Sequence, residues 1–211
     1  KSVDNAVNRH QLMTAFFLAI PGPKMIWQFG EFGYDLELNN DRLGIKPTRW
    51  EYLSNPDRLR LSQLYKEMLR LRAKYPVFNF PSNATLNLSP LQKTIHLQHP
   101  DLQVFLFGNF DLVTQGNQSI TFPKTGKWYN YFAGKELNVT SAQVSFGLRP
   151  NEFYLFTDKP LPLPQKDILQ ADFITSVPEE VDEDGFAIYP NPTTSNVMVE
   201  LPKEMAHALS S

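Results

Sequence analysis

The sequence predicts an α/β segment followed by an all-β segment, because the spacing of apolar residues changes once along the chain. Before Pro76 the spacing is helical or forms a short continuous run, and after Pro76 it alternates between apolar and polar residues. With 211 residues, 42% of them hydrophobic and 13% aromatic, the chain has enough apolar material for one or two packed domains. We therefore expect a globular protein over most of the length.

The first predicted helix spans Asp4 to Ile20 and ends at Pro21-Gly22-Pro23. Its apolar residues recur at positions i, i+3, i+4 and i+7, which indicates a helix that packs on one side. The chain opens directly into this pattern, so we expect it to begin within a domain. The residues expected on the buried side are Met13, Phe16, Phe17 and Ile20.

A short apolar run from Lys24 to Phe29 follows, and it is typical of a strand buried on both faces. The stretch from Tyr34 to Leu53 is polar and irregular, which predicts a long loop of the kind that is usually functional or mobile. A second helix begins at the capping sequence Ser54-Asn55-Pro56-Asp57 and closes at Pro76. Its expected buried stripe is Leu61, Leu64, Met68, Leu71 and Tyr75.

Short strand-like runs separated by Gly, Asn and Pro turns follow Pro76 and predict an antiparallel β-sandwich over residues 77–158. The runs are Thr94–Gln98, Gln103–Phe110, Ser119–Phe122, Lys127–Phe132, Gln143–Phe146 and Glu152–Thr157.

Residues 159–185 have the composition of an extended, solvated linker, with alternating prolines from Pro160 to Pro164 and an acidic run from Glu179 to Asp184. Residues 186–211 contain one alternating strand, Val197–Leu201, for which no partner is evident. We therefore expect a truncated β module at the end of the chain.

Composition and charge argue against several classes of function. The formal net charge is −2 with scattered Lys and Arg, so neither nucleic acid nor an anionic membrane is an expected partner. The chain has no cysteine, which excludes disulfides, thiolate metal sites and a cysteine nucleophile. The longest apolar stretch, Met13–Ile20, is far shorter than the roughly 20 residues of a membrane span.

Several motifs, in a fixed order, carry a resemblance to one family. The stretches IPGPKMIWQFGEFGYD (residues 20–35) and RLGIKPTRWEY (42–52) resemble the eighth strand and following loop of the α-amylases of glycoside hydrolase family 13, especially those of Bacteroidota. LRLRAKYPVF (69–78) is similar to that family's last barrel helix. Three later stretches are similar to strands of its C-terminal domain: VFLFGNF (104–110), GKWYNYFAGKEL (126–137) and RPNEFYLFT (149–157). The resemblance implies that residues 1–76 are helix 7, strand 8 and helix 8 of a (β/α)8 TIM barrel and that residues 77–158 are the C-terminal β-sandwich.

A further motif, YPNPTTSNVMVELP (189–202), looks like the opening of the C-terminal sorting domain that the type IX secretion system of Bacteroidota recognises. The resemblance implies a secreted or cell-surface protein with the secretion machinery as a partner.

The family hydrolyses α-1,4-glucosidic bonds of starch-like glucans with retention, using two carboxylates and a third, stabilising acid. In the family these acids lie upstream of the part that resembles this chain, and no His-Asp pair of the kind that carries the third acid occurs here. We therefore assign no catalytic residue and no cofactor to this chain, and we expect the chain alone to be inactive. The parent enzyme could bind calcium, through ligands that also lie upstream.

Candidate substrate-binding residues lie where the predicted strand ends and in the loop after it, since barrel enzymes place functional groups at that face. Each has an alternative: Glu31 could pair with a loop cation, Trp50 could anchor the loop, and Trp27 could stack on a sugar or pack in the core. For the histidines (His10, His96, His99) we expect polar packing. The candidates are Gln28, Glu31, Tyr34, Arg42 and Trp50.

Two other functions remain open on sequence grounds. A branching enzyme or transglycosylase of the same family would share this barrel end. A stand-alone carbohydrate-binding β-sandwich would instead expose coplanar aromatics on one sheet face, for which Trp128, Tyr129 and Tyr131 are the candidates. An accessory domain of a barrel enzyme would pack an apolar sheet face against the last helix.

Overall fold

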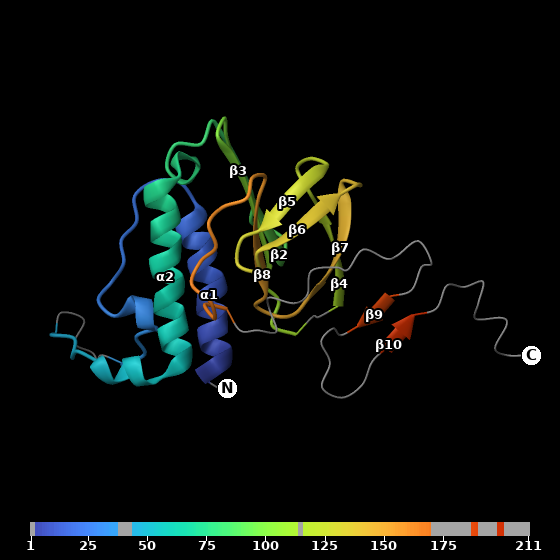
Figure 1. The fold of residues 1–211 in the computed structure, drawn as a ribbon. Helices are drawn as coiled ribbons and strands as arrows, with labels where there is room; N and C mark the ends of the chain where they lie inside the picture. Colours follow the sequence, from blue (N-terminus) through green and yellow to red (C-terminus); the bar gives the residue numbers. More distant parts are fainter. Residues whose placement is uncertain (1–2, 38–43, 114–115, 170–186, 190–197, 201–211) are drawn as a thin grey trace, which may run out of the picture.

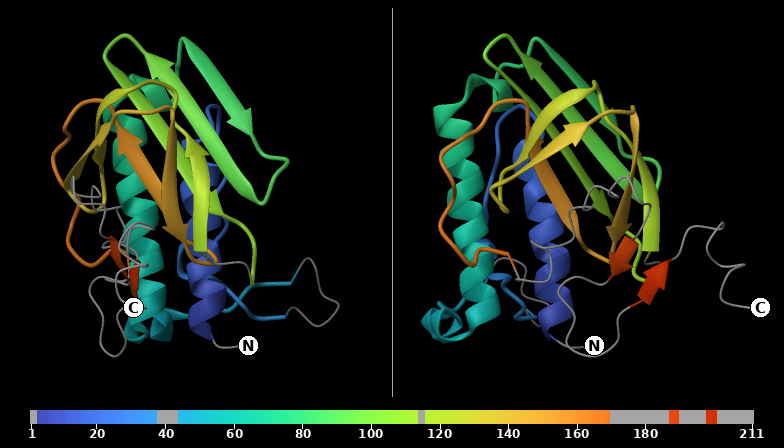
Figure 2. Two further views of the ribbon diagram at one scale, coloured as in Figure 1. Left: turned by 90° about the vertical axis from the view of Figure 1, so that its right-hand side faces the viewer. Right: turned by 45° about the vertical axis from the view of Figure 1, so that its right-hand side comes forward.

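The computed structural model describes residues 3–37, 44–113, 116–169, 187–189 and 198–200. Two long helices, α1 (Val3–Ala19) and α2 (Pro56–Lys74), form one layer beside a β-sandwich (Figure 1). Both helices run in the same direction, and the chain between them returns along their outer side (Figures 1 and 2). Parallel helices joined by an extended return are the arrangement of helix, strand and helix in α/β folds.

The two predicted helices are confirmed, but the predicted buried side of α1 is wrong in part. Met13 is 53% exposed and Phe17 is 39% exposed, whereas Leu12 and Leu18 are fully buried. Helical periodicity fixes the spacing of the buried residues but not which of two adjacent stripes faces the core. Within the described part of the chain, neither helix has the length and apolar character needed to cross a bilayer.

Helix α2 begins and packs as its sequence predicts. The side chain of Asn55 caps it by accepting hydrogen bonds from the backbone N–H groups of Asp57 (3.0 Å) and Arg58 (3.1 Å), and Pro56 occupies the first turn. Tyr75, the last residue of the predicted stripe, is only half-buried and forms the C-cap. The confirmed buried residues of the stripe are Leu61, Leu64, Met68 and Leu71.

The predicted buried strand from Lys24 to Phe29 is wrong for the described chain. Residues 24–28 belong to no strand, and Met25 (77%) and Trp27 (58%) are largely exposed. An apolar run becomes a buried parallel strand only where neighbouring strands bond to both of its edges, and the described residues provide no such neighbours.

The sandwich consists of a six-stranded antiparallel sheet and a two-stranded sheet packed on it (Figure 2). The order of the larger sheet is β1-β2-β3-β8-β5-β6, and β4 pairs with β7. All six predicted strands are confirmed, whereas β1 and β6 were not predicted. The strands are β1 (Asn83–Asn87), β2 (Gln92–His99), β3 (Leu102–Asn109), β4 (Gly116–Thr121), β5 (Gly126–Asn130), β6 (Lys135–Val139), β7 (Gln143–Leu148) and β8 (Phe153–Thr157).

Both faces of the larger sheet are buried at its centre, in β3 and β8, and alternation along β3 divides the side chains between two cores. On β3, Val104 and Leu106 join the core under the helices, while Phe105 and Phe107 join the aromatic core against the smaller sheet. The first core also contains the buried stripe of α2. Residues 1–76 and 77–158 therefore share one hydrophobic core.

The first part of the expected linker packs on this core. Ile168 (2% exposed) and Leu169 (4% exposed) are buried in it, and the Gln11 side chain donates a hydrogen bond to the Ile168 carbonyl (3.1 Å). The expectation of a solvated segment is therefore wrong for Ile168 and Leu169, which lie inside the expected linker. The acidic run from Glu179 to Asp184 lies outside the described residues.

The expected lone strand near the end of the chain has a partner. Strand β10 (Met198–Glu200) pairs antiparallel with β9 (Ala187–Tyr189). The prediction of an unpaired strand is wrong, because three residues of β9 carry too short a pattern to be read from the sequence.

Candidate functional site

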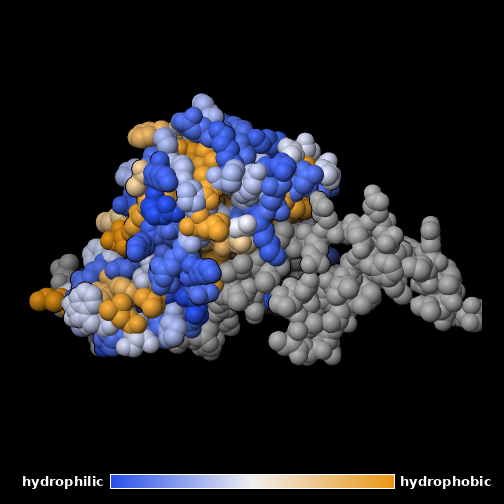
Figure 3. Space-filling view, in the orientation of Figure 1, coloured by the Kyte–Doolittle hydropathy of each residue, from blue (hydrophilic) through white to orange (hydrophobic). Residues whose placement is uncertain are grey.

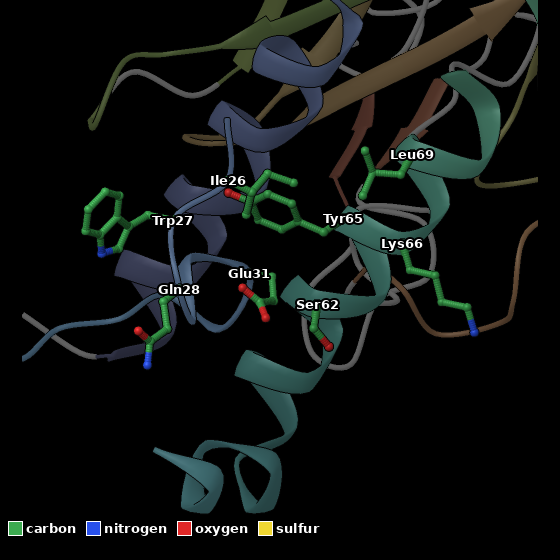
Figure 4. Close-up of a pocket in the computed structure, with 8 residues that line it drawn as sticks. All are labelled: Ile26, Trp27, Gln28, Glu31, Ser62, Tyr65, Lys66 and Leu69. Atoms are coloured by element: carbon green, nitrogen blue, oxygen red, sulfur yellow. The ribbon is translucent and has the colours of Figure 1, made fainter. Parts of the chain in front are cut away.

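A pocket of about 570 Å³ lies between the extended segment after α1 and the outer side of α2 (Figure 4). Ile26 and Glu31 lie on the side of the segment that faces α2, while the ring of Trp27 extends away from the helix. The wall is mostly apolar, with a carboxylate, an amide, a hydroxyl and an ammonium group at its edge. The lining residues are Ile26, Trp27, Gln28, Glu31, Ser62, Tyr65, Lys66 and Leu69.

Next to this pocket, the loop before α2 forms an aromatic cluster with the end of the segment. The Lys46 ammonium lies 5.0 Å from the ring centre of Trp27 and 4.9 Å from that of Tyr34, within cation–π range of both rings. The Tyr34 hydroxyl donates a hydrogen bond to the Pro47 carbonyl (3.2 Å). The loop is therefore held against Trp27 and Tyr34.

Trp50 completes this cluster. Its ring meets Phe29 edge-on at 5.1 Å, yet the residue is 64% exposed. An exposed indole that is fixed on one side can stack on the apolar face of a sugar ring with the other side. Trp50 therefore anchors the loop and also leaves part of its ring exposed, so the two alternatives for this residue do not exclude each other.

A sharp turn ends the extended segment. Phe29 adopts a left-handed conformation (φ 56°), and the 3-10 helix η1 (Gly30–Phe32) follows and ends at Gly33 (φ 69°). A side chain at Gly33 would also contact His10 and Leu61 at 3.4 Å. The turn brings Glu31 close to α2.

Asp35, Tyr52 and Arg58 form a polar group behind the turn. Arg58 Nη2 lies 2.5 Å from Asp35 Oδ2, and Arg58 Nη1 donates to the carbonyls of Phe32 (2.9 Å) and Gly33. The Tyr52 hydroxyl donates to Asp35, and this bond, followed by the bonds from Arg58, lowers the pKa of Asp35. The carboxylate of Asp35 is therefore held ionised.

The structure brings together some of the predicted site residues and separates others. Gln28 and Glu31 line the pocket, whereas Tyr34 and Trp50 belong to the aromatic cluster beside it. Arg42 lies outside the described residues. The alternative that Trp27 packs in the core is wrong here, since its ring is mostly exposed.

Sequence reasoning missed Arg58. It lies three residues before Leu61 and ten before Met68, so it falls on the buried stripe of α2. An arginine on an otherwise apolar helical stripe was a readable signal of a buried charge with partners elsewhere in the fold.

Two histidines make side-chain hydrogen bonds that fit the predicted polar packing. His10 Nε2 is 3.2 Å from the Tyr65 hydroxyl, and His96 Nε2 is 3.1 Å from Gln103 Oε1. Burial lowers the pKa of both histidines. Among the described residues, no group of three or more His, Cys, Asp or Glu side chains could hold a metal ion.

The aromatic residues of the sandwich do not form a binding platform. Trp128 is fully buried, Tyr131 is 2% exposed, and Tyr129 is only partly exposed. In strands β1 to β8 no aromatic side chain is largely exposed. One face of the larger sheet packs against α2, which is the arrangement expected of an accessory domain.

Comparison with known proteins identifies the fold but no close relative. No family model matches the sequence, and no curated protein matches it significantly. Among solved structures, a variant of AmyP in complex with maltotriose is similar over 75% of this chain and 35% of its own, with a TM-score of 0.57 and 16% identity.

Two further structures are similar. The α-amylase of Geobacillus thermoleovorans, complexed with acarbose, has a TM-score of 0.55 and 14% identity over 72% of this chain and 33% of its own. CldA, a cyclomaltodextrin glucanotransferase, has a TM-score of 0.52 and 18% identity over 73% and 33%. The chain thus spans about a third of the length of these proteins, and its helices and sandwich have the fold of the C-terminal region of α-amylases.

Proposed function

We propose that this chain is the C-terminal part of an α-amylase-type glycoside hydrolase of family 13, which cleaves α-1,4-glucosidic bonds in starch-like glucans. The observation that carries the proposal is the arrangement of two parallel helices with an extended return, packed on an antiparallel sandwich, which is shared with solved α-amylases. In this proposal residues 1–76 end the catalytic barrel and residues 77–158 form its accessory sandwich.

The exposed apolar segment supports an adjoining barrel. Met25 and Ile26 are exposed, residues 24–28 pair with no strand among the described residues, and apolar surface is visible on the helical side of the molecule (Figure 3). Neighbouring parallel strands would cover these side chains and bond to this backbone. An upstream part of the same protein is the expected source of those strands.

The catalytic step in this proposal is performed by carboxylates of the upstream barrel, in a retaining mechanism with a carboxylate nucleophile and a carboxylic acid. The residues of this chain contribute at the edge of the substrate site. Gln28 and Glu31 supply groups that hydrogen-bond to sugar hydroxyls, and Trp27 and Trp50 supply exposed aromatic faces. Maltotriose and acarbose in the similar structures fit a glucan substrate.

Transglycosylation is the second candidate, because CldA, a cyclomaltodextrin glucanotransferase, shares this fold. Hydrolysis and transfer use the same acids, so the products distinguish them. A stand-alone carbohydrate-binding module is disfavoured, since both faces of the larger sheet are covered at its centre.

Secretion and calcium binding are further parts of the proposal. The motif of residues 189–202 supports export through a type IX system to the medium or cell surface. Loss of the protein from the culture medium when residues 186–211 are deleted would test this export. Calcium would belong to the upstream barrel, and chelation of the full-length enzyme tests for it.

The first experiment is to read the frame upstream of Lys1 for the His-Asp pair and the two earlier carboxylate motifs, and to express the full-length protein. We expect it to release reducing sugar from soluble starch, whereas the 211-residue chain alone gives no release above buffer. Linear products support hydrolysis, and cyclic or branched products support transfer. An inactive full-length protein, or turnover by the chain alone, would contradict the proposal.

A further inference from the structure

Two buried arginines of α2, Arg58 and Arg72, hold the two ends of the extended segment that carries the candidate site residues. They are 7% and 9% exposed, and they stand fourteen positions apart on one side of the helix. At 1.5 Å per residue this separation is roughly 21 Å along the axis. The helix therefore offers two charged anchors at a fixed spacing.

Arg72 holds the start of the segment. Its Nη1 donates to the carbonyls of Leu18 (2.7 Å) and Ile20 (3.0 Å), and its Nη2 donates to that of Gly22 (2.8 Å). These carbonyls belong to the end of α1 and the turn after it, where the helix dipole is negative. The bonds fix the point at which the chain leaves α1.

Arg58 holds the end of the segment. It donates to the carbonyls of Phe32 and Gly33 and pairs with Asp35, while its guanidinium carbon lies 4.0 Å from the ring centre of Tyr52. Five N–H donors in a planar fork allow one side chain to bind several acceptors at once. The turn that presents Glu31 is thereby fixed to the first turns of α2.

Between the two anchors, residues 24–31 have few bonds of their own. Within the described chain they pair with no strand, and the amide of Gly30 donates to the Trp27 carbonyl (2.8 Å) in a local turn. Apart from the contacts of Trp27 with Lys46 and of Phe29 with Trp50, their position along α2 therefore depends on where the ends are held.

We propose that Arg58 and Arg72 are positioning residues for the glucan site, which set the placement of Trp27, Gln28 and Glu31 without contacting substrate. For its substrate class this inference rests on the function proposed above. The clamp itself is a property of the 211-residue chain and can be tested there.

The first test compares Arg72→Lys and Arg58→Lys with Arg60→Lys as the matched control. Arg60 lies on the same helix and pairs only with Asp57 among the described residues. Lysine keeps the charge and reaches one or two acceptors, so the variants are expected to fold. Amide exchange by NMR should be about tenfold faster at Ile20 in Arg72→Lys and at Phe32 and Gly33 in Arg58→Lys, relative to Leu106 in β3 of the same variant.

Leu106 reports global unfolding, so a residue that only stabilises the fold would accelerate all of these amides together. Equal acceleration at Leu106 and at the segment, or the same local acceleration in Arg60→Lys, would overturn the clamp.

The second test uses the full-length enzyme and maltoheptaose. We expect Arg72→Lys and Arg58→Lys to raise KM about fivefold with kcat within about twofold of the parent, because substrate contacts shift while the upstream carboxylates stay in place. An unchanged KM in an active enzyme would overturn the positioning role. A full-length protein without α-glucan activity would reject the proposed function, while local exchange acceleration would still support the clamp.

Discussion

Gly108 marks the closest approach of α1 to the sheet. A methyl group at this position in β3 would lie 2.6 Å from Leu12 Cδ1 and 3.0 Å from Phe153 Cβ. Both neighbours are buried in the core under the helices, so neither can move into open space. The helix layer and the sheet are therefore in contact through a position that has no side chain.

We expect Gly108→Ala to lower the free energy of unfolding by about 1–3 kcal/mol, as overpacked cores do. Urea denaturation followed by circular dichroism measures the loss. Gly147→Ala is the control, because the nearest atom to a new methyl group there is Asn117 Oδ1 at 3.7 Å. Equal stability of the two variants would show that α1 does not press on β3.

Glu67, Arg70 and Tyr131 form a polar link between α2 and the sandwich. Arg70 Nη2 donates to Glu67 Oε1 (2.6 Å) and lies 2.6 Å from the Tyr131 hydroxyl, which donates to Glu67. Burial raises the pKa of Glu67, but the hydrogen bonds from Arg70 and Tyr131 outweigh it and leave the pKa below its ordinary value of 4.5.

Replacing Glu67 with Gln should therefore weaken the fold in a pH-dependent way. Because the folded-state pKa is depressed, the ionised carboxylate contributes stability above its unfolded value, and this contribution is lost as the pH falls through the folded pKa. We expect a loss of about 1–3 kcal/mol at pH 7, which shrinks as the pH falls below 4.5. Urea midpoints at several pH values measure it, with the exposed Glu37→Gln as control. A pH-independent loss would rule out the charge as its cause.

At the scale of single residues, the sequence predicts which residue types form the core better than it predicts which side of a helix faces that core. Leu12, Ala15, Phe16 and Ala19 repeat at the same spacing as the predicted stripe, one position earlier, so periodicity alone does not separate the two. Gln28 and Glu31 were identified because they lie at the end of the predicted strand, where barrel enzymes place functional groups. The partners of Arg58 lie 23 to 26 residues away, and pairs at such separations leave no local pattern.

Among the elements, α2 is the one that the sequence defines most completely, and its start depends on Asn55. This residue closes the preceding 3-10 helix η2 (Trp50–Ser54) and caps α2. A further 3-10 helix, η3 (Pro76–Phe78), follows the C-cap and buries Val77 and Phe78. Both ends of α2 are thus fixed by residues just outside it.

We expect Asn55→Ala to lower stability by about 1 kcal/mol, since two backbone N–H groups lose their acceptor. Asn55→Asp should keep the cap and most of the stability. Thermal unfolding compares both with Ser54→Ala, an exposed neighbour whose side chain does not cap the helix. If Asn55→Ala matched Ser54→Ala, the cap would have no role in stability.

The elements that escaped prediction have weak patterns for physical reasons. β1 is an edge strand whose residues are mostly exposed, so it needs no alternation, and β6 has only Leu137 and Val139 buried. The segment at residues 24–28 was predicted as a strand but forms none. Its apolar run indicates that a strand there would be buried, but it does not show whether the neighbouring strands belong to the described chain.

On the scale of the whole molecule, the fold continues past the last strand of the sandwich. After β8 the chain runs back to the helices, where Leu161 packs on the core and Ile168 and Leu169 are buried in it. The boundary expected near residue 158 therefore does not coincide with the edge of the packed structure.

A chain that ends at Asp158 should be less stable than a chain that ends at Leu169 and less stable than the chain of 211 residues. Burial of one Ile or Leu side chain contributes about 1.5–3 kcal/mol, so the loss of Ile168 and Leu169 should exceed about 3 kcal/mol. Calorimetry of the three chains measures this. Equal stability of the two shortened chains would place the boundary at 158 after all.

The shared core also bears on how such proteins could recombine. A crossover near residue 76 would give the stripe of α2 a foreign sheet, and the side chains of β2, β3 and β8 that face it would have to match. Among the described residues, crossovers before Val3 or after Leu169 would cut no buried contact of this core. A chimaera of two proteins with this fold that inherits residues 3–169 as one block keeps the contacts between the helices and the sandwich. This block, and not the sandwich alone, is therefore the natural unit of exchange.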